Sequence, residues 1–231
     1  RDVLGSRGLG DVYKRQIPNS VTSIGEQAFE YCNSLASIII PKGVESIGSR
    51  AFTGCSSLKE INADLNNQNY SSIDGILFSK DNTTLVRCPE GKKNSYEIPD
   101  GVTNIGEQAF YNCTNLTSIE IPNSVTSIGE QAFHNCTGLT SMSITNGVTQ
   151  IGGNSFAYCE NLVSIGIPKS VTSIGAGAFN QCSSLTSVYY GGTKEEWNAI
   201  DITWFGNDCL KNATVHYKRD IPVSYTHLTL P

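Results

Sequence analysis

The eight cysteines of this 231-residue chain are considered first, because clustered thiolates could bind a metal ion or form disulfides. They stand at positions 32, 55, 88, 113, 136, 159, 182 and 209. No C-x-x-C pair occurs, and His134, His216 and His227 belong to no cysteine cluster in the sequence. The spacing of a zinc site is therefore missing, and the sequence predicts no metal and no cofactor.

Serine and acidic residues give two weaker chemical signals. Ser56-Ser-Leu-Lys59 matches the S-x-x-K motif of serine acylases, but the same frame elsewhere reads Thr114-Asn-Leu-Thr117. The Asn- and Asp-rich stretch 62–74 lacks the order of residues in a calcium loop. We interpret the first as a by-product of a repeat and the second as a solvated connection. The sequence therefore predicts no catalytic residue and no enzymatic activity.

The spacing of the cysteines indicates an internal repeat. Four of their successive gaps are 23 residues long, and the pattern I-P-x-x-V-x-x-I-G-x-x-A/S-F-x-x-C-x-x-L-x-x-I-x recurs with that period. The repeated aromatic position is occupied by Phe29, Phe52, Phe110, Phe133, Phe156 and Phe179. The six copies begin near Ile17, Ile40, Ile98, Ile121, Ile144 and Ile167. A fixed period of this length is typical of a solenoid, in which stacked coils share one core.

A single copy contains two short extended segments and one tight segment. Leu116-x-x-Ile119-x-Ile121 alternates, which favours a strand with one buried face that ends before Pro122. A second extended piece covers 125–129, and we expect one turn of α- or 3₁₀-helix at 130–136. Stacking at about 4.8 Å brings equivalent cysteines near disulfide range, but their side chains point the same way. We expect buried free thiols, with bridges between coils as the alternative.

The combination LxxIxIPxxVTSIGxxAFxxC resembles the BspA-like class of bacterial leucine-rich repeats over residues 17 to about 190. The resemblance implies a curved leucine-rich-repeat solenoid that binds proteins or mediates adhesion at the cell surface, without catalysis. The predicted fold class is α/β: a right-handed, strand-dominated solenoid with a parallel sheet, short helical turns, an inserted β-hairpin and a C-terminal cap.

The predicted organisation has four segments. Residues 1–16 and 222–231 do not follow the repeat, and we interpret both as possible artefacts of sequence assembly. Residues 17–190 form the solenoid, with a hairpin insertion at 62–97 that turns at 80–83. Residues 191–221 form the cap, which opens with Thr193 and Glu196 in a capping box and contains Trp197 in its core.

Charge and hydropathy limit the partners. Sixteen basic and 21 acidic residues give a net charge of −5, and charged residues make up 16% of the chain, against about 25% in an average soluble domain. This balance argues against nucleic acid as a partner, and no apolar run is long enough for membrane insertion. The resemblance implies an extracellular or cell-surface location; a secretion signal would lie upstream of this sequence. The oligomeric state stays open.

The open face of the sheet offers the candidate contact residues. Side chains between the apolar strand positions point outward and form two columns, one mostly of serine and one more varied. The candidate protein contacts are Ile39, Glu60, Glu97, Glu120, Tyr189 and Tyr190 on this face, with Asp81 and Asn82 at the hairpin tip. A solvated sheet face without a ligand is the alternative at residue level. At the level of the protein, the alternative is a structural spacer that presents another domain.

Overall fold

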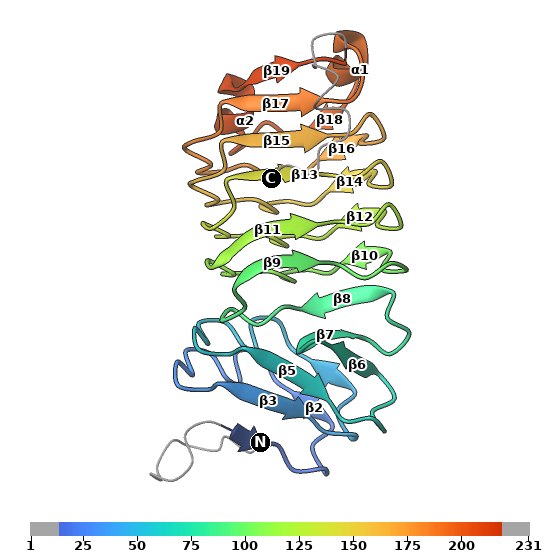
Figure 1. Ribbon diagram of the computed structural model, residues 1–231, viewed down its shortest axis with the longest axis vertical. Helices are drawn as coiled ribbons and strands as arrows, with labels where there is room; N and C mark the ends of the chain where they lie inside the picture. Colours follow the sequence, from blue (N-terminus) through green and yellow to red (C-terminus); the bar gives the residue numbers. More distant parts are fainter. Residues whose placement is uncertain (1–13, 219–231) are drawn as a thin grey trace. The chain divides into compact units, whose positions relative to one another are not determined.

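The computed structural model describes residues 14–218 and shows a strand-dominated solenoid in which short strands stack in register (Figure 1). The chain divides into two compact units, one up to Lys92 and one from Lys93, and this boundary lies inside the predicted insertion 62–97. The predicted tail 222–231 and most of the predicted segment 1–16 lie outside the described residues.

The first unit contains coils of the repeat followed by an antiparallel elaboration. Its strands are β1 (Lys14–Gln16), β2 (Ser23–Ile24), β3 (Ser37–Ile40), β4 (Ser46–Ile47), β5 (Glu60–Ala63), β6 (Tyr70–Ile73), β7 (Ile76–Ser79) and β8 (Thr84–Arg87). Strands β1, β3 and β5 pair in parallel, and β2 pairs in parallel with β4. Residues 14–16, which follow no repeat in the sequence, nevertheless pair in register with β3.

The inserted hairpin is confirmed and is larger than the sequence suggested. Strands β7 and β8 are antiparallel and are joined by the predicted turn at 80–83. Strand β6 adds a third antiparallel strand, joined to β7 through Asp74 and Gly75. These two residues have φ values of 50° and 75°, as a tight hairpin turn requires. The Asp-Gly pair is a strong hairpin signal and could have predicted this strand.

The second unit is built from regular coils and ends in the cap. Its elements are β9 (Asn94–Glu97), β10 (Asn104–Ile105), β11 (Leu116–Glu120), β12 (Ser127–Ile128), β13 (Ser141–Ser143), β14 (Gln150–Ile151), β15 (Ser164–Ile167), β16 (Ser173–Ile174), β17 (Ser187–Tyr190), α1 (Lys194–Asn198), β18 (Asp201–Ile202), α2 (Asp208–Asn212) and β19 (Thr214–His216). Strand β9 pairs with β11, and β13, β15, β17 and β19 form a parallel sheet. The two-residue strands β10, β12, β14, β16 and β18 form a second parallel ladder on another side of the coils.

The third side of each coil is a chain of turns, so the predicted helical turn at 130–136 is wrong. Here the Phe133 N–H donates to the carbonyl oxygen of Ser155 in the next coil at 2.7 Å, and Gln131 and Asn135 donate in the same way. Gln131 and Asn135 have φ values of 54° and 57°. Left-handed residues at this spacing direct alternate N–H groups to the next coil, whereas a helix would keep them within its own segment.

The core consists of ladders of identical side chains. The rings of Phe110, Phe133, Phe156 and Phe179 are fully buried and stack with centroids 5.0–5.3 Å apart. All eight cysteines are free thiols. Four thiols donate to the carbonyl oxygen of the repeat phenylalanine one coil earlier at 3.0–3.1 Å, in the pairs Cys55–Phe29, Cys136–Phe110, Cys159–Phe133 and Cys182–Phe156. A small side chain with a weak donor therefore suits this position better than a methyl group.

The C-terminal cap follows the sequence prediction and adds two elements to it. The Thr193 N–H donates to Glu196 at 2.8 Å and the Glu196 N–H donates to the Thr193 hydroxyl at 3.3 Å, which completes the capping box of α1. Trp197 is buried and packs edge-on against Tyr190 at 5.2 Å. Strand β19 pairs with β17 and ends the parallel sheet, and β18 and α2 are the two added elements.

Candidate functional site

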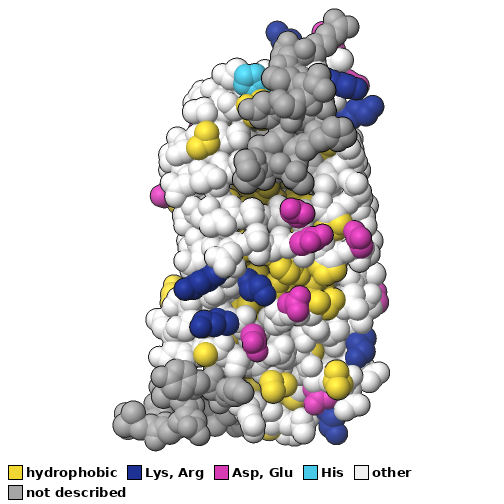
Figure 2. Space-filling model, in the orientation of Figure 1, with side chains coloured by type: hydrophobic (Ala, Val, Ile, Leu, Met, Phe, Trp, Pro, Cys, Tyr) yellow, Lys and Arg dark blue, Asp and Glu magenta, His cyan; other side chains and the backbone are white. Residues whose placement is uncertain are grey.

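The open face of the second unit presents its outward side chains in two aligned columns. Strands β13, β15, β17 and β19 are paired without a shift of register. One column consists of Ser141, Ser164, Ser187 and Thr214, and the other of Ser143, Gly166, Tyr189 and His216. Much of the visible surface in Figure 2 carries neither charged nor apolar side chains. The backbone ladder fixes the spacing of these groups, so the face is a preorganised polar surface.

An aromatic pair ends this surface. The half-buried ring of Tyr189 stacks on that of His216 with centroids 4.9 Å apart and planes 18° from parallel. Tyr189 is one of the predicted contact residues, and the structure places it on the open face. His216 was considered in the sequence only as a metal ligand, although its place two residues after Thr214 in a strand could have assigned it to the same column.

Two predicted acidic contacts lie side by side on another part of the unit. Glu97 of β9 and Glu120 of β11 are exposed partners in the ladder. Two carboxylates at neighbouring positions repel each other, and a cationic group bound between them would relieve this repulsion. The pair therefore forms a negatively charged spot on the exposed face of β9 and β11.

The first unit carries two predicted contacts on its own face. Ile39 of β3 is 51% exposed and borders a hollow of about 370 Å³ that is also lined by Ile17, Pro41 and Asp64. Glu60 of β5 is exposed, and its carboxylate accepts from the side-chain amide of Asn62, which pairs with Ile39. Ile39 is thus an exposed apolar group at the border of a hollow.

The hairpin tip is exposed as expected, but its polar groups are already engaged. The Asp81 carboxylate accepts from the Ser79 hydroxyl at 2.6 Å and from the N–H and hydroxyl of Thr83, and these hydrogen bonds lower its pKa. Asn82 accepts from the Ser71 hydroxyl at 2.6 Å. These bonds fix the turn, which leaves Asp81 and Asn82 less available to a partner than the sequence suggested.

Tyr190 was wrongly predicted to be an exposed contact. Its side chain is 1% exposed, because Tyr190 pairs with Ile167 and thus occupies an inward strand position against Trp197. Burial, together with the charge of Glu196, raises the pKa of its hydroxyl. Tyr190 belongs to the core of the cap.

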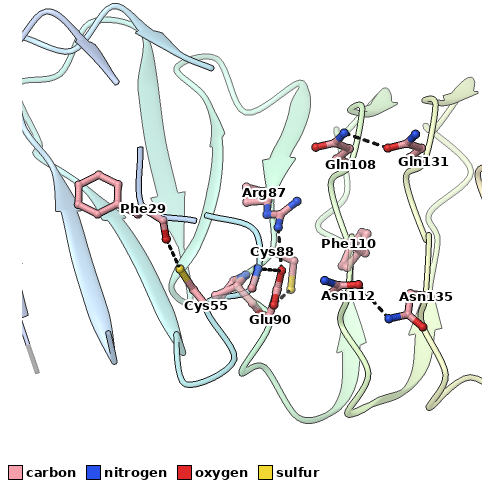
Figure 3. A network of polar contacts seen from close by, with 12 residues as sticks. Phe29, Cys55, Arg87, Cys88, Glu90, Gln108, Phe110, Asn112, Gln131 and Asn135 are labelled. Atoms are coloured by element: carbon pink, nitrogen blue, oxygen red, sulfur yellow. Dashed lines mark hydrogen bonds and ion pairs between the residues drawn. The ribbon is translucent and has the colours of Figure 1, made fainter. Parts of the chain in front are cut away.

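Buried polar groups outside these faces form hydrogen bonds and ion pairs within the protein. Arg87 and Glu90 form a buried ion pair at 3.3 Å, and Glu90 also accepts from the Gly54 N–H at 2.9 Å (Figure 3). Burial raises the pKa of the Cys55 thiol to about 12, which keeps it protonated and unreactive at neutral pH. Within residues 14–218, no group of three or more His, Cys, Asp or Glu side chains could hold a metal ion.

Figure 3 also shows two amide ladders of the second unit. The side chain of Gln108 donates to Gln131, and that of Asn135 donates to Asn112, each at 2.9 Å. Both ladders join residues 23 positions apart, so these polar side chains follow the period of the repeat.

Six copies of the BspA-type leucine-rich repeat region match the chain over residues 11–96 and 92–211. The chain belongs to this family. The match begins at residue 11, inside the predicted non-repeat segment 1–16, and extends to residue 211 of the predicted cap 191–221. No curated protein sequence matches the chain.

Solved structures of bacterial proteins show the same architecture. A leucine-rich cell surface protein from Faecalibacterium prausnitzii is 34% identical over 80% of this chain and 55% of its own, with a TM-score of 0.62. A leucine-rich repeat protein from Eubacterium ventriosum is 28% identical over 78% of this chain and 49% of its own, with a TM-score of 0.70. The pneumococcal vaccine antigen PcpA, 24% identical over 91% of this chain and 67% of its own with a TM-score of 0.56, shares the fold.

The chain thus spans about half the length of the first two of these relatives. Among its described residues, no helix has the length and apolar character needed to cross a membrane.

Proposed function

We propose that this BspA-type repeat region is a non-enzymatic protein-binding module of a bacterial surface or secreted protein. The observation that carries the proposal is the open face of β13, β15, β17 and β19, where aligned hydroxyl groups lead to the Tyr189–His216 stack. A rigid surface with an aromatic anchor loses little conformational entropy when a partner binds. The description of the Faecalibacterium relative as a cell surface protein supports the location.

The coil hydrogen bonds support the assignment of binding to this face. Backbone N–H groups of these strands already donate to carbonyl oxygens of the neighbouring strands, and the apolar residues Met142, Ile165 and Val188 point into the core. The outward columns therefore contribute little to folding, and substitutions in them should change binding without unfolding the coils.

Binding of the purified chain to a panel of immobilised host and bacterial surface proteins tests the proposal. We expect saturable binding to at least one of them, weakened about tenfold or more by Tyr189→Ser, because aromatic anchors dominate interface energetics. Gln150→Ser, at an exposed position of β14 in the other ladder, is the matched control and should bind as the unmodified chain does. Absence of saturable binding to every member of the panel would instead support the spacer hypothesis.

A further inference from the structure

Trp204 and Phe205 are adjacent aromatic residues that the second unit exposes rather than buries. Their side chains are 47% and 85% exposed, whereas the repeat phenylalanines of the same unit are fully buried. They lie between β18 and α2, outside the two columns of the open face.

The backbone of this loop is held on both sides. The Thr203 N–H donates to the carbonyl oxygen of Ile174 at 3.0 Å, and the carbonyl oxygen of Phe205 accepts from the Gly177 N–H at 2.8 Å. The Asn207 N–H donates to the carbonyl oxygen of Trp204 at 3.0 Å. The exposure of the two rings is therefore a property of a fixed loop, and a partner would meet them already positioned.

The repeat itself does not require these two side chains. By its hydrogen bond to Ile174, Thr203 takes the place that Gly175 has in the preceding coil, where the Gly175 N–H donates to Ile151. Phe205 takes the place of Ala176, whose carbonyl oxygen accepts from Asn154. Trp204 between them is an additional residue without a counterpart in the regular coil. An inserted tryptophan next to a phenylalanine in an alanine position adds apolar surface that the fold does not bury.

The sequence around the pair is acidic. Residues 194–211 contain four acidic and two basic side chains, and Asp201 and Asp208 flank the aromatic pair in the chain. Asp201 and Thr203 line one end of a groove of about 360 Å³, and Glu130 also borders this groove. Exposed apolar rings flanked in the chain by an aspartate on each side match a ligand in which an apolar group stands between positive charges.

We infer that the Trp204–Phe205 loop is a second interaction surface that binds a polypeptide segment presenting an apolar side chain flanked by Lys or Arg. The apolar side chain packs against the two rings, and the basic side chains face Asp201, Asp208 and the acidic border of the groove. The same carboxylates disfavour an anionic lipid surface, which is why a protein segment is the expected ligand. This surface is separate from the open face of the proposed function.

The chain supplies its own reporter for this surface. It contains two tryptophans, of which Trp197 is buried and Trp204 is half exposed, so a change in accessible tryptophan fluorescence reports on Trp204. Before any ligand is added, the cationic quencher caesium should quench this emission more efficiently than the anionic quencher iodide, because the carboxylates concentrate cations around the ring. Equal quenching by the two ions would contradict the acidic environment on which the inference rests.

In the experiment, peptides that bind the full chain are selected from a phage-displayed random library. The selected peptides are then synthesised, and their binding is measured. We expect sequences with an apolar residue between Lys or Arg residues, a blue shift of tryptophan emission on binding, and weaker binding at high salt. Trp204→Ser and Phe205→Ala should each weaken binding by about tenfold or more. Binding to Trp204→Ser is measured by calorimetry, because this variant lacks the fluorescent reporter. Val163→Ser, at another exposed apolar position of this unit, and Tyr189→Ser should leave peptide binding unchanged.

Three results would overturn the inference. Selected peptides whose affinity is the same for the Trp204→Ser and Phe205→Ala variants would show that the loop is not their site. A blue shift with neutral phosphatidylcholine vesicles, lost in Phe205→Ala, would make the loop a lipid contact. Sedimentation as a dimer that becomes monomeric in Phe205→Ala would make it a contact between two copies. Surface-protein binding that Tyr189→Ser leaves unchanged, with peptide binding still weakened by Trp204→Ser and Phe205→Ala, would count against the proposed function alone.

Discussion

Two buried asparagines, Asn67 and Asn207, replace backbone contacts at the places where the repeat is interrupted. The Asn67 amide donates to the carbonyl oxygens of Pro41 and Val44 at 2.7 and 3.0 Å, and its side-chain oxygen accepts from two N–H groups at the start of the insertion. Asn207 accepts from the Phe179 N–H at 2.9 Å, where a regular coil would provide a carbonyl group. One side chain thus ends the ladder in each case without leaving a buried polar group unpaired.

Replacement of Asn207 by alanine should destabilise the second unit by about 2–4 kcal/mol. The change removes the bond from Phe179 and the two bonds that the Asn207 amide donates to the carbonyl oxygens of Gly175 and Thr203, at about 1 kcal/mol or more each. Urea unfolding followed by circular dichroism measures the loss. Asn212→Ala, at an exposed position, is the control and should change the free energy of unfolding by less than about 0.5 kcal/mol. Equal effects of the two variants would contradict this role of Asn207.

The sequence predicted the residues that repeat and failed mainly where a single residue acts alone. The phenylalanine and cysteine ladders were predictable, because the same residue type recurs several times at intervals of 23 residues. Asn207 has no repeated counterpart, and Asn is common throughout this chain, so its role depends on contacts between residues far apart in sequence. Tyr190 follows the outward-facing Tyr189 in a strand, so the alternation of strand side chains alone assigns it to the core, although its aromatic ring is of a type common in contact surfaces.

At the level of the element, the glycine of each Ile-Gly pair sets how closely coils approach. A Cβ atom at Gly152 would lie 2.6 Å from the carbonyl carbon of Gly129 and 2.7 Å from the nitrogen of Glu130 in the preceding coil. These are backbone atoms, which cannot move without opening the ladder between β12 and β14. The same geometry recurs at Gly129 and Gly175, which explains why the position is glycine in successive coils.

Gly152→Ala should therefore destabilise the second unit by about 1–3 kcal/mol, the typical effect of overpacking. Gly25 occupies the same place in its repeat, but an added Cβ atom there would have no neighbour within 4 Å. Gly25→Ala should change stability by less than about 1 kcal/mol, with a small gain expected from the reduced entropy of the unfolded chain. The midpoints of urea unfolding of the two variants give the comparison. Equal destabilisation by both would show that backbone contact between coils is not the cause.

At the level of the whole molecule, the stability of a solenoid depends on the core that neighbouring coils form together. The buried cysteine thiols are part of this core. Burial raises the pKa of the Cys159 thiol from 9.0 to about 12, and burial also raises that of Cys182, with the neighbouring thiols Cys159 and Cys209 adding to the effect. An unfolded chain exposes these thiols and releases their protons near the ordinary pKa. Folding therefore retains protons that the unfolded chain loses.

Stability should consequently fall as the pH rises from about 9 towards 12, and the thiols should contribute no pH dependence below this window, where both states are protonated. Each buried thiol adds a slope of up to about 1.4 kcal/mol per pH unit within the window. Urea unfolding at a series of pH values measures this slope, which should become smaller in Cys159→Ala and smaller again in Cys159→Ala/Cys182→Ala. Slopes are compared rather than absolute stabilities, because each alanine also removes packing and the hydrogen bond to a phenylalanine carbonyl. A slope that stays the same in all three proteins would assign the alkaline transition to other groups, of which Tyr70 and Tyr190, with pKa values raised by burial, are the next to substitute.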